Sequence, residues 1–296
     1  MYQRYNCYKL TKNKSVRKTN KDIFFNNMIE LIIKKIMEVF NLKILISNDD
    51  GIMAPGIAIL KKYLEKEHEV YVVAPDVERS ATGHAITIRQ PLWAKEVKFG
   101  DMLFGYAVNG TPADSVKIGL EAIHKKIKFD IVISGINKGA NLGTDILYSG
   151  TVSAALEGAL NGVPSIAISC YDFIEPNYDD AAKILFDLLR KIDLEKWPEF
   201  TTLNINVPKI PYDEIKGIKI TKQSKRRYDD YFEERKDPYG NSYYWMLGKI
   251  VEDDNDENSD YSAINNGYVS VTPISVFLTK EDYIEDLKEV FEVERN

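Results

Sequence analysis

From residue 42 onward, the chain alternates short apolar runs rich in β-branched residues with longer stretches that have the apolar spacing of a helix. The run "LKILIS" is followed by the helical stretch "GIAILKKYLEK" and then by a second apolar run, "HEVYVVAP". Further along, "FDIVISG" and "VPSIAISC" flank another helical stretch. Pro55 is expected in the first turn of one helix, and Thr111 is the expected N-cap of another. This alternation is typical of βαβ units, which build a largely parallel sheet. The sequence therefore predicts an α/β fold whose ligand sites lie at the carboxyl ends of the strands.

The rhythm changes after about residue 222. "YDDYFEERKDPYGNSYYWMLG" predicts two aromatic-rich strands joined by a turn around Pro238 and Gly240, and "GYVSVTPISVFLT" predicts another strand pair or one bent strand. The chain closes with an amphipathic helix for which Thr279 is the expected N-cap. The expected parts are a basic tail (1–36), the α/β core (37–222), and a β-hairpin arm with a C-terminal helix that serves oligomerisation (223–296).

Charge is unevenly distributed along the chain. The net charge is −6 and the sequence pI is about 5.3, which argues against a dedicated nucleic-acid-binding protein. The tail is basic, with nine Lys or Arg against two acids. It is interpreted as a disordered extension, a transit-like peptide, or a translated upstream region with the true start at Met28 or Met37.

Neither secretion nor a membrane location is expected. The stretch "MIELIIKKIMEVF" is interrupted by Lys34 and Lys35, so it contains no uninterrupted apolar segment for a signal peptide or a membrane span. The two cysteines, Cys7 and Cys170, form no disulfide framework, which favours a reducing cytoplasm.

The adjacent acids Asp49 and Asp50 directly follow the first apolar run, in "ILISNDDGI". Two neighbouring carboxylates raise each other's pKa unless a positive charge lies beside them, and a divalent cation is the simplest such charge. An ordinary polar turn is the alternative, because Asn, Asp and Gly all favour turns. Ser80 and an asparagine of "SGINKGANLG" also follow expected strands, and would complete an all-oxygen site suited to magnesium or manganese.

A second feature is the start of the helix in "YSGTVSAALEGAL". Ser149, Gly150 and Thr151 stand where free backbone N–H groups and the positive end of the helix dipole suit a phosphate. Simple N-capping by the hydroxyl residues is the alternative. A cation site together with an anion-binding helix start favours phosphoester chemistry.

The sequence lacks the motifs of several other enzyme classes. The chain lacks GxxxxGK[ST] and has no GxGxxG after the first strand, and its paired acids Asp49 and Asp50 are adjacent rather than spaced DxD. The histidines are scattered: His68 and His124 are expected to be solvent-facing residues at helix ends, and only His84 lies in a candidate active loop.

Four blocks of the sequence resemble the signature blocks of the SurE (survival protein E) nucleotidases. They are "ILISNDDGIMAPGI", "VVAPDVERSATGHAIT", "NGTPADSVKIGL" and "VISGINKGANLGTDILYSGTVSAALEGA". The resemblance runs from about residue 42 to 280 and does not cover the tail. Ala81 is a departure, since many members have glycine there.

The resemblance implies a Rossmann-like three-layer core and a metal-dependent phosphatase for nucleoside 5′- and 3′-monophosphates, with one divalent cation per subunit. It places the metal on Asp49, Asp50, Ser80 and Asn137, and the phosphate on Ser149, Gly150 and Thr151. Asp49 or Asp50 would also orient the attacking water. A C-terminal arm exchanged between subunits implies a homodimer or a dimer of dimers.

Two rival functions remain open at this point. A nucleotide-sugar-binding transferase is one, because "HEVYVVAP" after a first βα unit also suits such domains. The other is a non-catalytic module that binds phosphoprotein or RNA through the basic tail.

Overall fold

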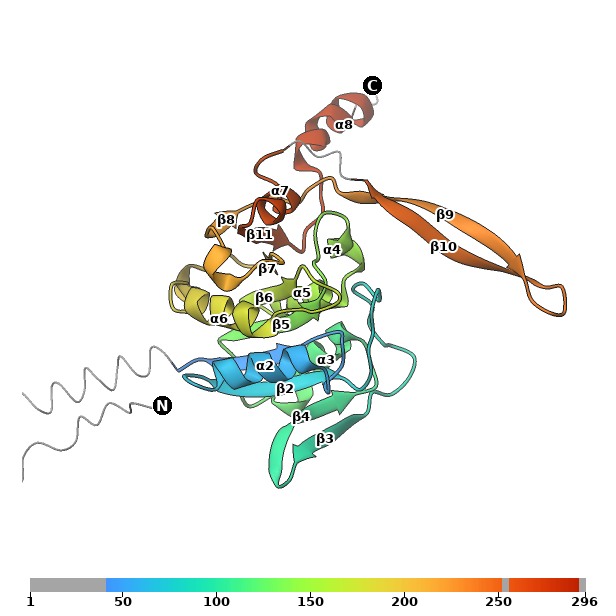
Figure 1. The fold of residues 1–296 in the computed structure, drawn as a ribbon. Coiled ribbons are helices and arrows are strands. Elements are labelled where there is room, and N and C mark those ends of the chain that lie inside the picture. The colour runs from blue at the N-terminus through green and yellow to red at the C-terminus, as the bar shows by residue number, and fades with distance from the viewer. Residues whose placement is uncertain (1–40, 252–255, 293–296) are drawn as a thin grey trace, which may run out of the picture. The chain divides into compact units, whose positions relative to one another are not determined.

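The computed structural model describes residues 41–251 and 256–292 (Figure 1). The described residues from Leu42 onward form one compact unit. The expected basic tail, 1–36, lies outside the described residues.

A nine-stranded sheet forms the centre of this unit, in the order β3-β4-β2-β1-β5-β6-β7-β11-β8. The run of neighbouring strands from β4 to β7 is parallel, whereas β3 and β11 each pair antiparallel with a neighbour. The strands are β1 (Lys43–Ser47), β2 (Glu69–Pro75), β3 (Ala94–Phe99), β4 (Met102–Val108), β5 (Ile131–Lys138), β6 (Ser165–Cys170), β7 (Thr201–Val207), β8 (Ile218–Ile220) and β11 (Val269–Ser275).

Helices cover both faces of this sheet. On one face α2 packs against α6, and on the other α3 packs against α5 (Figure 1). The helices are α2 (Pro55–Leu64), α3 (Pro112–Ile118), α4 (Asp145–Tyr148), α5 (Gly150–Leu160), α6 (Tyr178–Leu189), α7 (Asp260–Asn265) and α8 (Ile284–Phe291). Single turns lie at Gly119–Ile123, Leu194–Lys196, Tyr212–Glu214 and Glu281–Tyr283. The predicted three-layer α/β fold is confirmed.

The first apolar run becomes the most buried part of the sheet. Ile44, Leu45 and Ile46 of β1 are fully buried, because helices cover both faces of the strand. Burial of each such side chain stabilises the fold by roughly 1.5–3 kcal/mol. A strand covered on both sides has no polar face, which explains why its sequence is continuously apolar rather than alternating.

Local helix signals are confirmed at two N-termini. Pro55 begins α2, a position whose N–H would have no partner within the helix, so the missing N–H of proline costs nothing there. Thr111 caps α3 in a capping box: its hydroxyl accepts from the Asp114 N–H at 3.0 Å, and the Asp114 carboxylate accepts from the Thr111 N–H at 2.9 Å. The predicted N-cap at Thr279 is wrong, because α8 begins at Ile284 after a single 3₁₀ turn.

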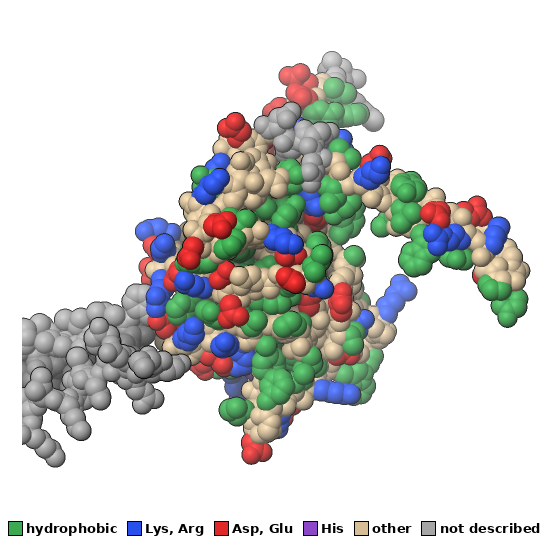
Figure 2. All heavy atoms as spheres, viewed as in Figure 1, with side chains coloured by type: hydrophobic (Ala, Val, Ile, Leu, Met, Phe, Trp, Pro, Cys, Tyr) green, Lys and Arg blue, Asp and Glu red, His purple; other side chains and the backbone are tan. Residues whose placement is uncertain are grey.

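The segment after residue 222 divides between an arm and the core. The aromatic-rich strands β9 (Arg227–Lys236) and β10 (Ser242–Val251) form the predicted hairpin with its turn at 237–241. The hairpin projects from the core, and hydrophobic side chains lie along its surface (Figures 1 and 2). By contrast, β11 enters the main sheet between β7 and β8, so this part of the segment belongs to the core. None of the helices in the described residues is long and apolar enough to cross a membrane.

Candidate active site

A pocket of about 580 Å³ lies at the carboxyl edge of the sheet, next to the foot of the hairpin. It brings together side chains that follow β1, β2 and β5 and the start of α5, which are far apart in the sequence. Its lining consists of Asp49, Asp50, Glu78, Ser80, Ala81, Asn137, Lys138, Ala140, Asn141, Asp145, Tyr148, Ser149, Phe173, Tyr228, Asp230 and Met246.

The turn after β1 directs both aspartates to this pocket. The Asn48 side-chain amide donates to the carbonyl of Gly51 at 2.9 Å, and Gly51 takes a positive φ of 93°. An added Cβ on Gly51 would lie 3.1 Å from the backbone of Val77, so the loop after β2 passes close to this turn. The turn interpretation and the site interpretation of "NDDG" are therefore compatible, since the turn positions the acids.

Both carboxyl groups occupy a setting that disfavours negative charge. Burial raises the pKa of Asp49, and hydrogen bonds from Thr151 oppose this effect only in part. Burial and the neighbouring charge of Asp49 raise the pKa of Asp50 to about 6, although the main-chain amide and the ammonium of Lys138 act in the opposite direction. A positive charge beside this pair would lower the pKa of both groups.

The helix start contacts Asp49 directly. The hydroxyl of Thr151 donates to a carboxylate oxygen of Asp49. A Cβ added to Gly150 would lie 2.7 Å from the Cβ of Asp49, so only glycine allows this approach. Ser149 is the N-cap of α5, because its hydroxyl accepts from the Val152 N–H at 3.1 Å. Ser149 lines the pocket, whereas Gly150 and Thr151 lie buried behind it against Asp49.

Ser80 and Asn137 both line the same pocket, and each presents an oxygen. The Ser80 hydroxyl donates its proton to Glu78 at 2.7 Å, so its lone pairs remain available. The side-chain nitrogen of Asn137 donates to the Gly139 carbonyl at 2.8 Å, so its side-chain oxygen remains free to accept or to ligate.

These oxygens fit a hard divalent cation. The Oδ2 atom of Asp50 and the Oδ1 atom of Asn48 are buried and have no hydrogen-bond partner among the described residues. Buried polar atoms are rarely left unpartnered unless a water or an ion satisfies them. The described residues contain no cluster of three or more His, Cys, Asp and Glu that would hold a metal. A cation here would therefore depend on two carboxylates and neutral oxygens, a set typical of magnesium or manganese rather than zinc.

Alanine in place of glycine at position 81 strains the backbone. Ala81 adopts φ = 55°, the left-handed region, which costs a residue with a Cβ roughly 1–2 kcal/mol relative to glycine. The loop keeps this conformation because the Arg79 N–H donates to the Asp49 carbonyl at 2.7 Å and the Gly83 N–H donates to the Tyr148 carbonyl at 3.0 Å. These two bonds attach the Ser80 loop to the aspartate turn and to α4.

The histidines differ from the sequence expectation. His68 is buried against Phe186, and His124 is half-buried among Tyr71, Tyr106 and Phe129, so the prediction that both face solvent is wrong. Apolar packing partners distant in the sequence cover these rings, and sequence spacing does not reveal them.

His84 does not line the pocket but anchors the loop that carries Ser80. Its Nε2 lies 2.9 Å from a carboxylate oxygen of Glu157, whose side chain is only 3% exposed. The same carboxylate accepts from Lys117 at 3.0 Å and from Asn161 at 3.0 Å. Glu157 thus joins the Ser80 loop, α3 and α5 at one point.

Acid is expected to weaken this junction. Burial alone would raise the pKa of Glu157, but the hydrogen bonds from His84, Lys117 and Asn161 outweigh it and hold the pKa below its usual value of 4.5. A depressed carboxyl pKa contributes stability above pH 4.5 that is lost as pH falls through the lower, folded-state value. Wild type is expected to exceed Glu157→Gln in free energy of unfolding by about 1–3 kcal/mol at pH 7, and the difference should shrink below pH 4.5.

Urea titrations of both proteins at several pH values measure this difference. Glu121→Gln is the matched control, since Glu121 pairs with the same Lys117 but is exposed. A difference in free energy of unfolding between wild type and Glu157→Gln that stays constant down to pH 3 would contradict the stabilising role of the Glu157 carboxylate.

Sequence reasoning missed Asn141, which is buried and lines the pocket. Its N–H donates to the side-chain oxygen of Asn206 at 2.8 Å, and its carbonyl accepts from Asn204 at 2.8 Å. Its own amide nitrogen donates to Ser169 at 2.8 Å. The sequence signals were an Asn pair in the apolar run "LNINV" and a second Asn four residues after Asn137. They meet only because β6 pairs with β5 on one side and with β7 on the other.

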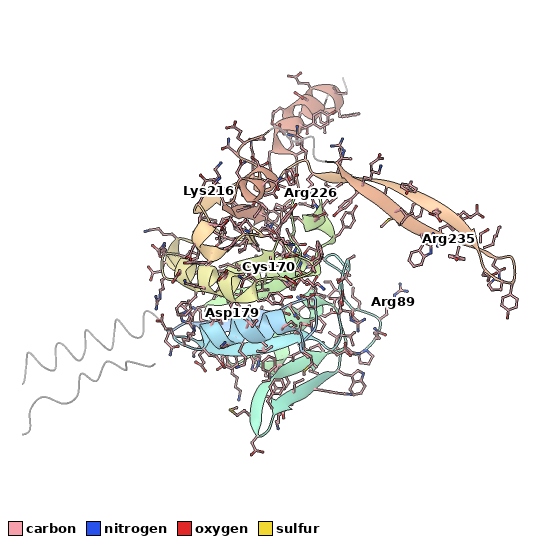
Figure 3. The ribbon with its side chains drawn as sticks, in the orientation of Figure 1. Arg89, Cys170, Asp179, Lys216, Arg226 and Arg235 are labelled. Atoms are coloured by element: carbon pink, nitrogen blue, oxygen red, sulfur yellow. The ribbon has the colours of Figure 1, made fainter. Side chains whose placement is uncertain are left out.

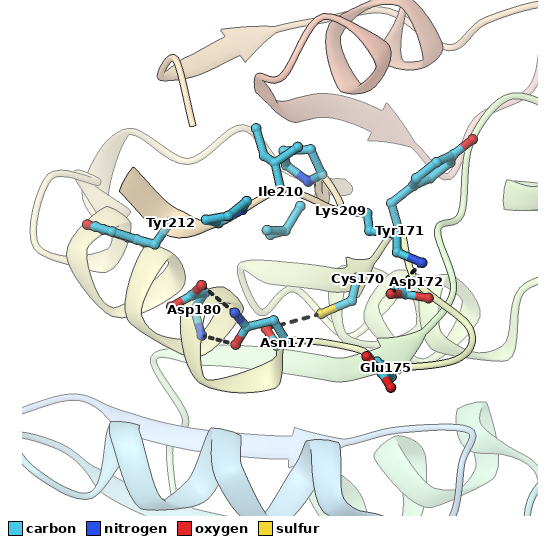
Figure 4. Close-up of a pocket in the computed structure, with 12 residues that line it drawn as sticks. Cys170, Tyr171, Asp172, Glu175, Asn177, Asp180, Lys209, Ile210 and Tyr212 are labelled. Atoms are coloured by element: carbon cyan, nitrogen blue, oxygen red, sulfur yellow. Dashed lines mark hydrogen bonds and ion pairs between the residues drawn. The ribbon is translucent and has the colours of Figure 1, made fainter. Parts of the chain in front are cut away.

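A second pocket, of about 460 Å³, lies at the carboxyl ends of β6 and β7 (Figure 4). It contains none of the predicted site residues. Its acid Asp172 already pairs with Lys209 at 2.9 Å, and Asn177 bonds to Asp180. The unpartnered oxygens at the aspartate turn therefore make the first pocket the stronger candidate.

Fold and site together define a three-layer α/β protein with a carboxylate-lined pocket at the carboxyl edge of a parallel sheet. The profile of the family described as "Survival protein SurE" matches residues 44–230. The chain is 73% identical over 252 residues to the 5′-nucleotidase SurE of Petrotoga mobilis, covering 85% of this chain and 100% of the relative. It is 62% identical to the 5′-nucleotidase SurE of Kosmotoga olearia, covering 85% and 99%. The chain belongs to the SurE family.

A solved structure supports the same assignment. The crystal structure of the SurE protein from Aquifex aeolicus superposes with a TM-score of 0.73 at 42% identity, covering 84% of this chain and 99% of that one. The family match favours neither the transferase nor the tail-driven binding module.

Proposed function

We propose that this protein is a metal-dependent phosphomonoesterase that hydrolyses nucleoside 5′-monophosphates, and also 3′-monophosphates, to nucleoside and phosphate. The observation that carries the proposal is the unpartnered oxygen of Asp50, which lines the same pocket as Asp49 and the N-cap of α5, Ser149. Relatives with high identity that are named 5′-nucleotidase support the substrate class.

The metal site in this proposal consists of Asp49, Asp50, Ser80 and Asn137. Magnesium or manganese suits these oxygen donors, at one cation per subunit. When bound, the cation supplies an acidified water and neutralises charge on the phosphoryl group.

The chain's own residues bind and orient the substrate. Ser149, Gly150 and Thr151 form the start of α5, where the positive end of the helix dipole suits the phosphate oxygens. Thr151 holds Asp49 in place by its hydrogen bond, and Gly150 lets the helix approach that carboxylate. The unpartnered Oδ2 of Asp50 is positioned to accept a proton from the attacking water, with Asp49 as the alternative base.

Apolar side chains also line the pocket. Phe173, Tyr148, Tyr228 and Met246 provide surfaces on which a nucleobase would stack. Stacking discriminates weakly between bases, so this lining would let one site take several of them.

Assembly through the hairpin is part of the proposal, as a homodimer or a dimer of dimers. An isolated two-stranded hairpin is marginal in water, and Tyr231, Phe232, Tyr244 and Trp245 of this hairpin are all exposed. A second copy would cover these side chains. A cytoplasmic location fits the low cysteine content and the free, buried Cys170.

Chelation tests the proposal. Purified full-length protein should release phosphate from AMP, GMP, CMP and p-nitrophenyl phosphate, and EDTA should lower the rate by at least about 100-fold. Added magnesium or manganese should restore it, whereas calcium gives a matched control of equal charge and larger radius. Phosphate release that persists in EDTA would overturn the metal-dependent mechanism.

A further inference from the structure

The charges that line the active-site pocket are unbalanced. Five carboxylates line it: Asp49, Asp50, Glu78, Asp145 and Asp230. In the described part of the chain, Asp145 is the one of these five that pairs with an arginine, Arg226, which lies at the foot of the hairpin (Figure 3). A dianionic phosphate that approaches this pocket therefore meets net negative charge, which one divalent cation only partly offsets.

Lys138 is the only lysine or arginine that lines the pocket within the described part of the chain. It is the last residue of β5 and directly follows Asn137, and its backbone pairs with Cys170 of β6. The strand therefore fixes the Cα position, while the flexible stem leaves the ammonium free to follow a ligand.

The Lys138 ammonium is uncommitted but close to the aspartates. It forms no ion pair or hydrogen bond with any described residue, and its side chain is exposed. It nevertheless acts electrostatically on Asp50, where it opposes the rise in pKa caused by burial. A cation that lines the same pocket as a carboxylate, without a direct bond to it, remains available for an incoming anion.

We propose that Lys138 is a substrate-binding residue of this site, whose ammonium binds the dianionic phosphoryl group and offsets the repulsion from the surrounding carboxylates. This inference rests on the proposed function, because it concerns the same phosphomonoester. Lys138 acts in capture and binding of the substrate more than in cleavage of the P–O bond, since an exposed, flexible ammonium gains similar Coulomb energy in the ground and transition states.

The same charge has the opposite effect on a metal. An ammonium near Asp50 repels a divalent cation, so its removal should tighten cation binding and weaken phosphate binding. General damage to the pocket would weaken both cation binding and phosphate binding. Opposite changes in the two affinities therefore distinguish a binding role of Lys138 from a structural one.

Steady-state kinetics with AMP test the proposal, using Lys138→Gln, Lys138→Arg and the control Lys125→Gln, an exposed lysine outside the pocket. Lys138→Gln is expected to lower kcat/KM about tenfold, mainly through KM, with kcat within about twofold of wild type. Lys138→Arg should recover most of the loss, and Lys125→Gln should match wild type. The dependence of kcat/KM on ionic strength should be shallower for Lys138→Gln.

Calorimetric titration provides a readout independent of turnover. Manganese should bind Lys138→Gln at least as tightly as wild type, whereas inorganic phosphate, added to the manganese-loaded protein, should bind several-fold more weakly. Unchanged KM and phosphate affinity, or weaker binding of both ions, would overturn the role of Lys138. If wild type itself fails to hydrolyse AMP, the proposed function falls, and the phosphate titration still decides whether Lys138 binds the anion.

Discussion

Asp49→Asn is expected to lower kcat/KM for AMP by roughly 10³-fold. Asparagine keeps the shape of the side chain and can still accept the Thr151 hydroxyl bond, so the change removes mainly the charge. Loss of that charge weakens cation binding and removes half of the carboxylate pair. The measurement is phosphate release across a range of manganese concentrations, which separates weaker metal binding from slower hydrolysis.

The fold should survive this substitution. Asp49 is 5% exposed and lies beside Asp50, so its ionised form is costly to bury without a cation. The metal-free Asp49→Asn protein is therefore expected to have a free energy of unfolding at pH 7 equal to wild type or higher by about 1–2 kcal/mol. Asp76→Asn is the matched control, because Asp76 is an exposed acid at the end of the neighbouring β2 strand. Full activity in Asp49→Asn would refute the site.

Gly56→Ala is expected to destabilise the fold by about 2–3 kcal/mol. A Cβ on Gly56 would lie 2.2 Å from the carbonyl oxygen of Ile136, which is backbone and cannot rotate away. The first turn of α2 must then move away from β5, and Ile136 is the residue before Asn137. Urea unfolding measures the loss of stability, and manganese titration reports whether the neighbouring site moves with it.

A change on the same helix supplies the comparison. Ala58→Gly, two residues further along and exposed, should cost only about 0.5–1 kcal/mol through helix propensity. If Gly56→Ala is no less stable than Ala58→Gly, the close approach of α2 to β5 is not a constraint on this fold.

Features that depend on short stretches of chain were readable from the sequence. The apolar runs became strands, Thr111 became an N-cap, and the aromatic segments became a hairpin. These signals depend on residues within a few positions of one another. The local prediction of an N-cap at Thr279 failed, and the predicted solvent exposure of His68 and His124 failed because it depended on packing partners elsewhere in the chain.

Some features of the candidate site are likewise local in the sequence, and others are not. The adjacency of Asp49 and Asp50, and the hydroxyl residues at the start of α5, are visible in the sequence. The junction of His84 with Glu157 and the unbalanced charge around Lys138 are not, because they arise from loops that follow different strands. Likewise, β11 belongs to the main sheet although it follows the hairpin in the chain.

The sequence by itself determined the class of fold, the family and the residue types at each strand end, because periodicity and ordered blocks are local properties of the chain. Only the tertiary structure decided which strand ends meet, since strand order in a sheet is set by long-range packing. It also decided which buried oxygens are left unpartnered, because a hydrogen-bond partner can come from anywhere in the chain.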